Sequence, residues 1–208
     1  MLRIVEYMGI CHVSAPNRRY KNSDVLQNVI SYIGNDRPKY YDLWQKSATT
    51  KRRMMRVEIK QLPDYHVAYI RRFGEYGAEI GAAFGKLLQW AQPRGLLANG
   101  TTLSVFWDNP DVTPAENCRT DACVTVPGNT EPSGDIRLQT LPGGACAIYH
   151  TEATNQELVD AWQWMFREWL PNSGYAPAGR PPFELYYNDA AVHPERKWIV
   201  DICIPVEA

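Results

Sequence analysis

The sequence lacks the features that mark membrane proteins, secreted disulfide scaffolds and metal enzymes. No uncharged apolar run approaches the length of a transmembrane helix, and Arg3 and Glu6 interrupt the apolar N-terminal stretch before a signal-peptide core. The five cysteines are an odd number without a C-x-x-C pair, which favours reduced thiols. No metal-ligand spacing joins them to the four histidines, and no Ser/His/Asp triad is visible. We therefore expect a soluble, cytoplasmic protein without a cofactor.

What the sequence does contain is a globular composition rich in aromatic residues. Hydrophobic residues make up 45% of the 208 positions and charged residues 22%, which excludes wholesale disorder. Seven Trp and twelve Tyr suggest an aromatic core or pocket. The formal net charge of −1 argues against a chain that binds nucleic acid with its whole surface.

The near-neutral total hides two segments of opposite charge. Residues 1–56 contain eleven Lys/Arg and four Asp/Glu, a net of +7, whereas residues 57–208 have a net of −8. The basic arm has apolar residues at helical spacing over 22–33 and a basic run at 51–53, so we expect it to be partly helical. Two interpretations stay open: contact with DNA or a protein partner, or packing on the acidic body or on a second subunit of a homodimer.

An internal repeat organises the acidic body. Residues 106–126 align without gaps on residues 186–206, with five identities at an offset of 80. Residues 57–70 align on 136–149 at an offset of 79, so one insertion separates the two matches. These alignments predict two similar halves, 57–126 and 135–207, joined by a Pro/Gly-rich linker.

Each half has the pattern strand, helix, strand, strand. In the first half, strand residues bend at Leu62-Pro63, a helix spans about 77–91, and strands follow near 102–107 and 122–126. In the second half, Thr154 and Glu157 form a plausible capping box at the start of the helix. The predicted fold is α+β: duplicated strand-helix-strand-strand units with pseudo-twofold symmetry and a central ligand cleft, preceded by the N-terminal arm.

The body also resembles a known family. VEIKQLPDYHVAYIRRFGEY, WLPNSGY, PFELYYND and KWIVDICIPV occur in that order and together span about three-quarters of the chain. They resemble the gyrase-inhibitor-like (GyrI-like) effector-binding superfamily, which includes the small gyrase inhibitory protein and the ligand domains of multidrug-responsive transcription regulators. The resemblance implies the duplicated architecture for residues 57–208. The first 56 residues depart from the regulators, because no complete DNA-binding domain is recognisable there.

The repeat singles out one carboxylate. Glu184, in an aromatic strand, is equivalent to Ser104 in the first half, so packing alone does not require it. The resemblance implies that Glu184 projects into the cleft and meets lipophilic cations, and that Tyr76 lies near the cleft. Aromatic side chains would supply apolar area and cation–π attraction to such ligands. The candidate walls are Trp107, Tyr149, Tyr186 and one or more of Trp162, Trp164 and Trp169.

Plainer interpretations exist for these residues. Glu184 could lie in solvent or pair with an arginine, Trp162 and Trp169 could be ordinary core, and Tyr76 could cap the first helix. Binding of a lipophilic or cationic small molecule is the favoured function, in transcriptional regulation or xenobiotic sensing. The first alternative is a small-molecule hydrolase with Glu184 and Tyr149 as catalytic groups, and the second is a gyrase-interacting protein.

Overall fold

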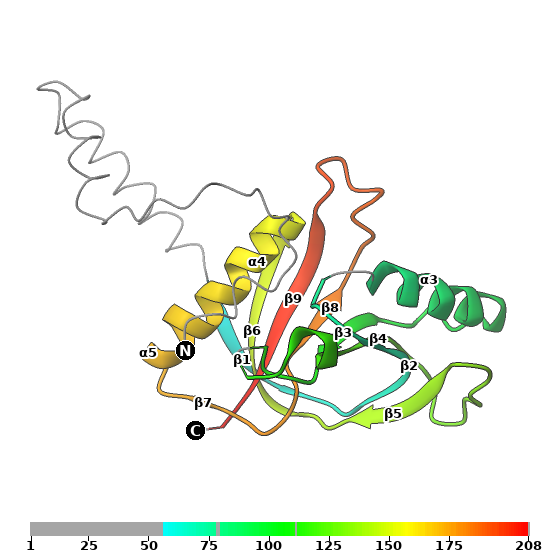
Figure 1. Cartoon of the computed structure of the whole chain (residues 1–208), viewed down its shortest axis with the longest axis horizontal. Helices are drawn as coiled ribbons and strands as arrows, with labels where there is room; N and C mark the ends of the chain where they lie inside the picture. Colours follow the sequence, from blue (N-terminus) through cyan, green and yellow to red (C-terminus); the bar gives the residue numbers. More distant parts are fainter. Residues whose placement is uncertain (1–55, 78–79, 111, 208) are drawn as a thin grey trace, which may run out of the picture. The chain divides into compact units, whose positions relative to one another are not determined.

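A computed structural model describes residues 56–77, 80–110 and 112–207, and within them a nine-stranded antiparallel sheet with two main helices (Figure 1). The expected basic arm lies, apart from Arg56, outside the described residues. The predicted α+β fold is confirmed. Within the described ranges, no helix combines the length and hydropathy needed to cross a bilayer.

Both halves show the predicted order of elements. The first half contains β1 (Val57–Leu62), β2 (Tyr65–Phe73), α3 (Ile80–Ala91), a 3-10 turn (Gln92–Arg94), β3 (Thr102–Phe106), a second 3-10 turn (Ala115–Asn117) and β4 (Arg119–Thr125). The second half contains β5 (Arg137–Leu141), β6 (Gly144–Ala153), α4 (Asn155–Trp164), a π turn (Met165–Trp169), α5 (Leu170–Asn172), β7 (Ala176–Pro177), β8 (Phe183–Tyr186) and β9 (Trp198–Glu207).

Local sequence explains where the second helix begins. Thr154 accepts the backbone N–H of Glu157, and the Glu157 carboxylate accepts the backbone N–H of Thr154. This reciprocal pair is the predicted capping box, and it satisfies two donors that the first helical turn cannot pair. The helix then continues through the π turn at Met165–Trp169 into α5.

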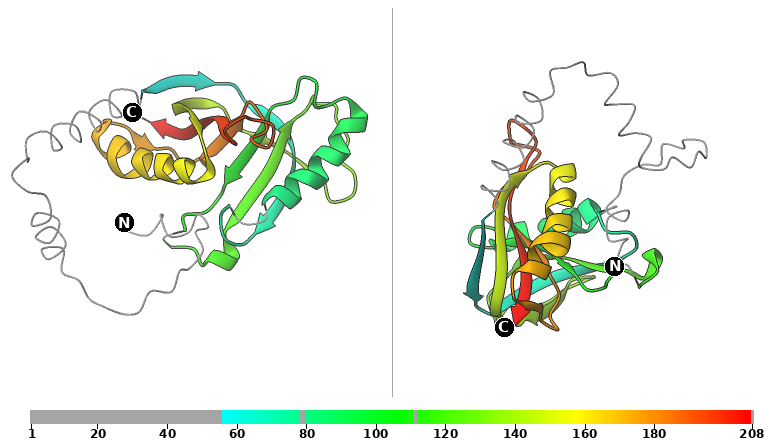
Figure 2. Two further views of the ribbon diagram at one scale, coloured as in Figure 1. Left: turned by 90° about the horizontal axis from the view of Figure 1, so that it is seen from above. Right: turned by 90° about the vertical axis from the view of Figure 1, so that its left-hand side faces the viewer.

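The two halves exchange their first strands. The sheet order is β1-β6-β9-β8-β3-β4-β2-β5, and the short ninth strand, β7, pairs with β9 outside this order. β1 therefore pairs with β6 of the second half, and β5 pairs with β2 of the first. Instead of one bent strand at Leu62-Pro63, the chain leaves β1 and enters β2 at the other end of the sheet after two residues. Two residues span roughly 10 Å at most, so the sheet curls until its two ends meet at this corner. Figure 2 shows this curl as a change of strand direction between the two halves.

The curl encloses one hydrophobic core, and the helices cover the other face. Alternating strand residues such as Leu103, Leu185 and Cys203 point into the curl, away from the helices. On the opposite face, Ala122 and Val124 pack beneath α3 in a second cluster. Side chains that alternate with the inner cluster therefore face α3 and α4.

The symmetry axis can be located from the strand register. Ser104 of β3 lies directly opposite Glu184 of β8, and these are the equivalent positions of the repeat. At the corner, Asp64 accepts the backbone N–H of Gly143 at 2.7 Å, and these residues are also equivalent, at the offset of 79. The pseudo-twofold axis therefore passes between both pairs.

Candidate functional site

Glu184 lies at the centre of a row of residues that crosses the helix-covered face of the sheet. The register places Ile202 on one side of Glu184 and Ser104 on the other, with Tyr149 beyond Ile202 and Ala122 beyond Ser104. Residues directly opposite each other in antiparallel strands share a face, so the whole row points toward α3 and α4. Because side chains alternate along a strand, Tyr186 projects from the same side of β8 as Glu184.

The Glu184 carboxylate is buried and held by two neutral donors. Its side chain is only 6% exposed. The indole N–H of Trp162 donates to Oε1 at 2.6 Å, and the Tyr186 hydroxyl donates to Oε2. Burial raises the pKa of Glu184, while the Tyr186 and Trp162 hydrogen bonds lower it. Among the side chains of this row, the Glu184 carboxylate is therefore the one that a bound cation would stabilise most.

The hydroxyl of Tyr186 is equally constrained. It lies 3.0 Å from Ser104 Oγ in addition to its bond with Glu184, so it bridges the two halves. Burial, reinforced by the neighbouring Glu184, raises the pKa of Tyr186 well above its ordinary value. Tyr186 therefore remains a neutral donor at physiological pH.

Aromatic side chains from both helices surround this network. Phe84 of α3 makes an edge contact with Tyr186, and Trp162 of α4 makes an edge contact with Phe106 of β3. Each helix thus contacts an aromatic residue from the strand of the other half. The neighbouring ring contacts are Tyr76–Phe106, Trp162–Phe166 and Tyr186–Trp198.

Comparison with known proteins identifies this architecture. Residues 55–207 match the model of the GyrI-like small molecule binding domain. The chain belongs to the GyrI-like family. A DNA gyrase inhibitor of Edwardsiella piscicida is 31% identical over 157 residues, which cover 73% of this chain and 98% of that protein.

Two solved structures share the GyrI-like fold. The EcmrR–DNA complex superposes with a TM-score of 0.65 at 16% identity, covering 89% of this chain and 69% of that one. The EcmrR C-terminal domain gives a TM-score of 0.58 at 18% identity, covering 74% of this chain and 98% of that domain. At these identities the likeness concerns the fold.

The other predicted site residues occupy different places in this GyrI-like domain. The ring of Tyr76 contacts Phe106, which in turn contacts Trp162. The Tyr76 hydroxyl donates to the backbone carbonyl of Asp108 at 2.7 Å. Tyr149 faces the helices but lies two strands from Glu184, roughly 10 Å by strand spacing. Its ring contacts Trp164.

Trp107 lies apart from the Glu184 carboxylate. Trp107 packs against the core inside the curl, on the other face of the sheet, and its indole N–H donates to Asp121 at 2.6 Å. Trp169 ends the π turn and is half-buried. The structure therefore brings Glu184, Tyr186, Trp162 and Tyr76 into one region, while Trp107 stabilises the opposite face.

Sequence reasoning missed three aromatic residues near Glu184. Phe106 is equivalent to Tyr186 in the repeat, so the alignment contained the signal for it. Phe84 lies on α3 and contacts Tyr186 of the other half, and the sequence holds no signal that this helix reaches across the axis. Trp198 contacts Tyr186 from β9, a neighbour that only the strand order reveals.

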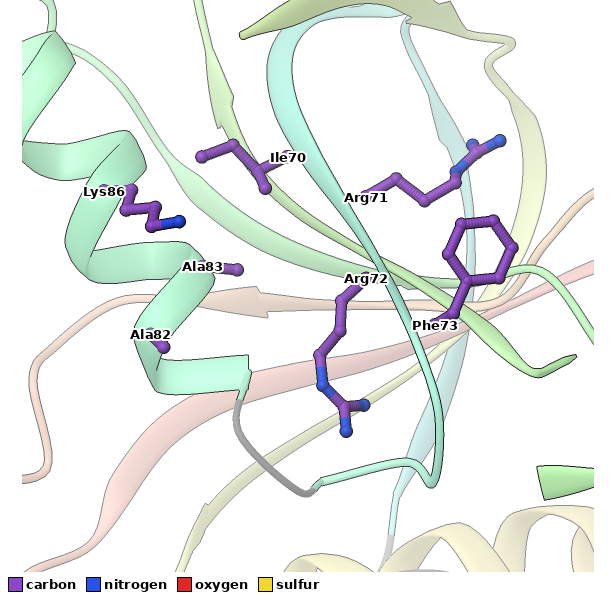
Figure 3. Close-up of a pocket in the computed structure, with 7 residues that line it drawn as sticks. All are labelled: Ile70, Arg71, Arg72, Phe73, Ala82, Ala83 and Lys86. Atoms are coloured by element: carbon purple, nitrogen blue, oxygen red, sulfur yellow. The ribbon is translucent and has the colours of Figure 1, made fainter. Parts of the chain in front are cut away.

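A separate hollow of about 230 Å³ lies between β2 and α3. Figure 3 shows Arg72 and Lys86 projecting toward it, whereas Arg71 and Phe73 extend on the other side of β2. None of its seven lining residues is a predicted site residue. In the part of the chain that the structure describes, no three His, Cys, Asp or Glu side chains are grouped to hold a metal ion.

Proposed function

We propose that this protein binds lipophilic, cationic small molecules at Glu184, between α3 and α4, and uses the binding to regulate transcription or sense xenobiotics. The observation that carries the proposal is a buried carboxylate whose two hydrogen-bond partners, Trp162 and Tyr186, are neutral. A cationic ligand would compensate the charge that burial disfavours. The surrounding rings would add cation–π attraction of about 0.5–2 kcal/mol per contact.

Ligand entry must move side chains, because Glu184 and Trp162 are almost excluded from solvent. The ring of Trp162 stacks on Phe166 and touches Phe106, so its displacement would open the region between the two halves. Four buried free cysteines (Cys118, Cys123, Cys146 and Cys203) support a reducing compartment, the cytoplasm.

A matched pair of dyes tests the carboxylate. Rhodamine 6G, a lipophilic cation, and fluorescein, an anion with the same ring system, are titrated into the full chain and followed by fluorescence anisotropy. We expect binding of rhodamine 6G, weaker binding after Glu184→Gln, and unchanged binding after Glu131→Gln, which removes an exposed glutamate in the linker. Equal affinity for both dyes, or for wild type and Glu184→Gln, would reject the proposal.

Gyrase is the second candidate partner, because the gyrase inhibitor of Edwardsiella piscicida is 31% identical over 73% of the chain. The acidic body or the basic arm 1–56 would provide the contact. Pull-down of purified gyrase by the full chain, and inhibition of supercoiling, are the direct assays. Failure of both would reject gyrase as a partner.

Hydrolysis is the alternative for the same carboxyl. Glu184 with a raised pKa, next to the Tyr186 hydroxyl, has the properties of a general acid or base. Incubation with strained electrophiles, followed by mass spectrometry, would show product if the ligand is consumed. Recovery of intact compound would support binding without turnover.

A further inference from the structure

Ser104 faces the charged group of the site across the symmetry axis. Directly opposite residues of antiparallel strands have Cβ atoms about 4.5–5.5 Å apart. Ser104 is 2% exposed and Glu184 is 6% exposed, so neither position is open to water. The two equivalent positions therefore share one small, dry region but differ in charge.

The serine belongs to the hydrogen-bond network without adding charge to it. Tyr186 lies between Ser104 Oγ and the Glu184 carboxylate and contacts both. A carboxylate at position 104 would be buried beside Glu184, and two like charges at that separation cannot both ionise without a compensating cation. A serine keeps the local charge at a single negative unit.

The first half also lacks the donors that hold Glu184 in the second. The residue equivalent to Tyr186 is Phe106, which has no hydroxyl. The residue equivalent to Trp162, at the offset of 79, is Ala83. That offset persists to the helix ends, since Gly95 and Gly174 both adopt left-handed backbone conformations. Neither the Phe106 side chain of β3 nor the Ala83 side chain of α3 can therefore donate a hydrogen bond in the way that Tyr186 and Trp162 do.

From this asymmetry we infer that Ser104 is a specificity-determining residue that restricts the site to ligands with one positive charge. The inference rests on the proposed function and defines its ligand class. The cationic group lies toward β8 and α4, and the apolar remainder lies against Phe84 and Phe106. A second positive charge on the ligand would have to be buried against those rings without a counterion.

Ethidium and propidium test this inference, because they share a phenanthridinium core and propidium carries a second cationic group. Both are fluorescent and are titrated into nucleic-acid-free full-length protein at about pH 8, which favours the ionised form of Glu184 beside a bound cation. Wild type is expected to bind ethidium more tightly than propidium by about tenfold or more. Ser104→Glu is expected to reduce or invert this ratio, and Ser104→Gln, of similar size without charge, to preserve it.

Each outcome has a distinct meaning. If wild type binds neither dye, the proposed function fails and the inference fails with it. If wild type binds both dyes with equal affinity, or if Ser104→Glu and Ser104→Gln give the same ratio, the inference fails while cation binding stands. Should Ser104→Glu not fold, the shorter Ser104→Asp replaces it, and the wild-type ratio still decides.

Discussion

Asp121 and Asp201 occupy equivalent positions in the two halves, and both are buried acceptors on the face inside the curl. Asp121 receives two N–H groups of Arg71, at 2.7 and 2.8 Å, and one each from Trp107 and Gln139. Asp201 is bonded to His150 at 2.6 Å and to the Tyr187 hydroxyl at 2.7 Å. The repeat has thus kept the carboxylate and changed its basic partner from an arginine to a histidine.

This difference predicts unequal costs for two matched substitutions. Asp121→Asn leaves Arg71 without its counterion and points an amide donor at other donors, so we expect a loss of about 3–5 kcal/mol of unfolding free energy. Asp201→Asn interrupts two hydrogen bonds beside an exposed histidine and should cost about 1–3 kcal/mol. Urea denaturation of both variants measures the difference. Equal losses would contradict the expectation that the contacts of Asp121 stabilise the fold more than those of Asp201.

The corner where the sheet ends meet predicts a requirement for glycine. A Cβ atom on Gly143 would lie 2.3 Å from the carbonyl oxygen of Leu62 and 2.5 Å from the carbonyl carbon of Pro63. Because both neighbours are backbone atoms, Gly143→Ala is expected to lower the unfolding free energy by about 1–3 kcal/mol. Gly128→Ala is the control, since its Cβ would meet nothing within 4 Å. An unchanged unfolding free energy in Gly143→Ala would show that the β1–β2 and β5–β6 connections can move apart without cost.

The sequence was sufficient for the repeat, the order of elements and the capping box, because these depend on local pattern. The exchange of β1 and β5 was not predictable, because hydrophobic alternation shows that a segment is a strand but not which strand it pairs with. The equivalence of Ser104 and Glu184 was visible in the alignment. Their position on the axis required the register between β3 and β8.

The alternation of side chains along β3 is sufficient to predict which face of the sheet Trp107 occupies. Leu103, Val105 and Trp107 follow one another at every second position, so they share a face, and Ser104 lies on the other. An aromatic residue in line with two core aliphatics packs with them. Trp162 was different, because its contact with Glu184 depends on where α4 crosses the sheet.

The raised pKa of Glu184 predicts that ionisation of this residue costs folding stability. A carboxyl whose pKa is higher in the folded state than its ordinary value of 4.5 binds more protons when folded, so stability falls as pH rises through that window. Glu184→Gln removes the titration. Between about pH 4 and pH 8 we expect the stability of the variant relative to wild type to increase as pH rises, and to level off once Glu184 is ionised in the folded state.

Thermal unfolding of wild type, Glu184→Gln and the surface control Glu131→Gln over that range checks this expectation. A constant difference across pH would show that Glu184 does not titrate differently in the folded state. The same pKa shift predicts that affinity for a cationic dye rises with pH over the window in which Glu184 ionises, and that Glu184→Gln loses this dependence.

The hydrogen bond from Trp162 to Glu184 predicts energetic coupling between these two residues. Trp162→Phe removes the donor at 2.6 Å from Oε1, so the pKa of Glu184 should rise further. It also removes ring volume, a loss that is the same whether position 184 is Glu or Gln. A double-mutant cycle between Trp162→Phe and Glu184→Gln cancels that shared loss and isolates the part of the bond that depends on the charge of Glu184, for which we expect about 0.5–3 kcal/mol at neutral pH.

Trp164→Phe provides the control on the same helix, because Trp164 contacts Tyr149 and not Glu184. Its cycle with Glu184→Gln should give coupling near zero, since it shares no partner with the carboxylate. The Trp162 coupling should also shrink at low pH, where a protonated Glu184 is a weaker acceptor for the indole N–H. Coupling of equal size for both tryptophans, or coupling independent of pH, would mean that Trp162 acts on Glu184 through packing alone.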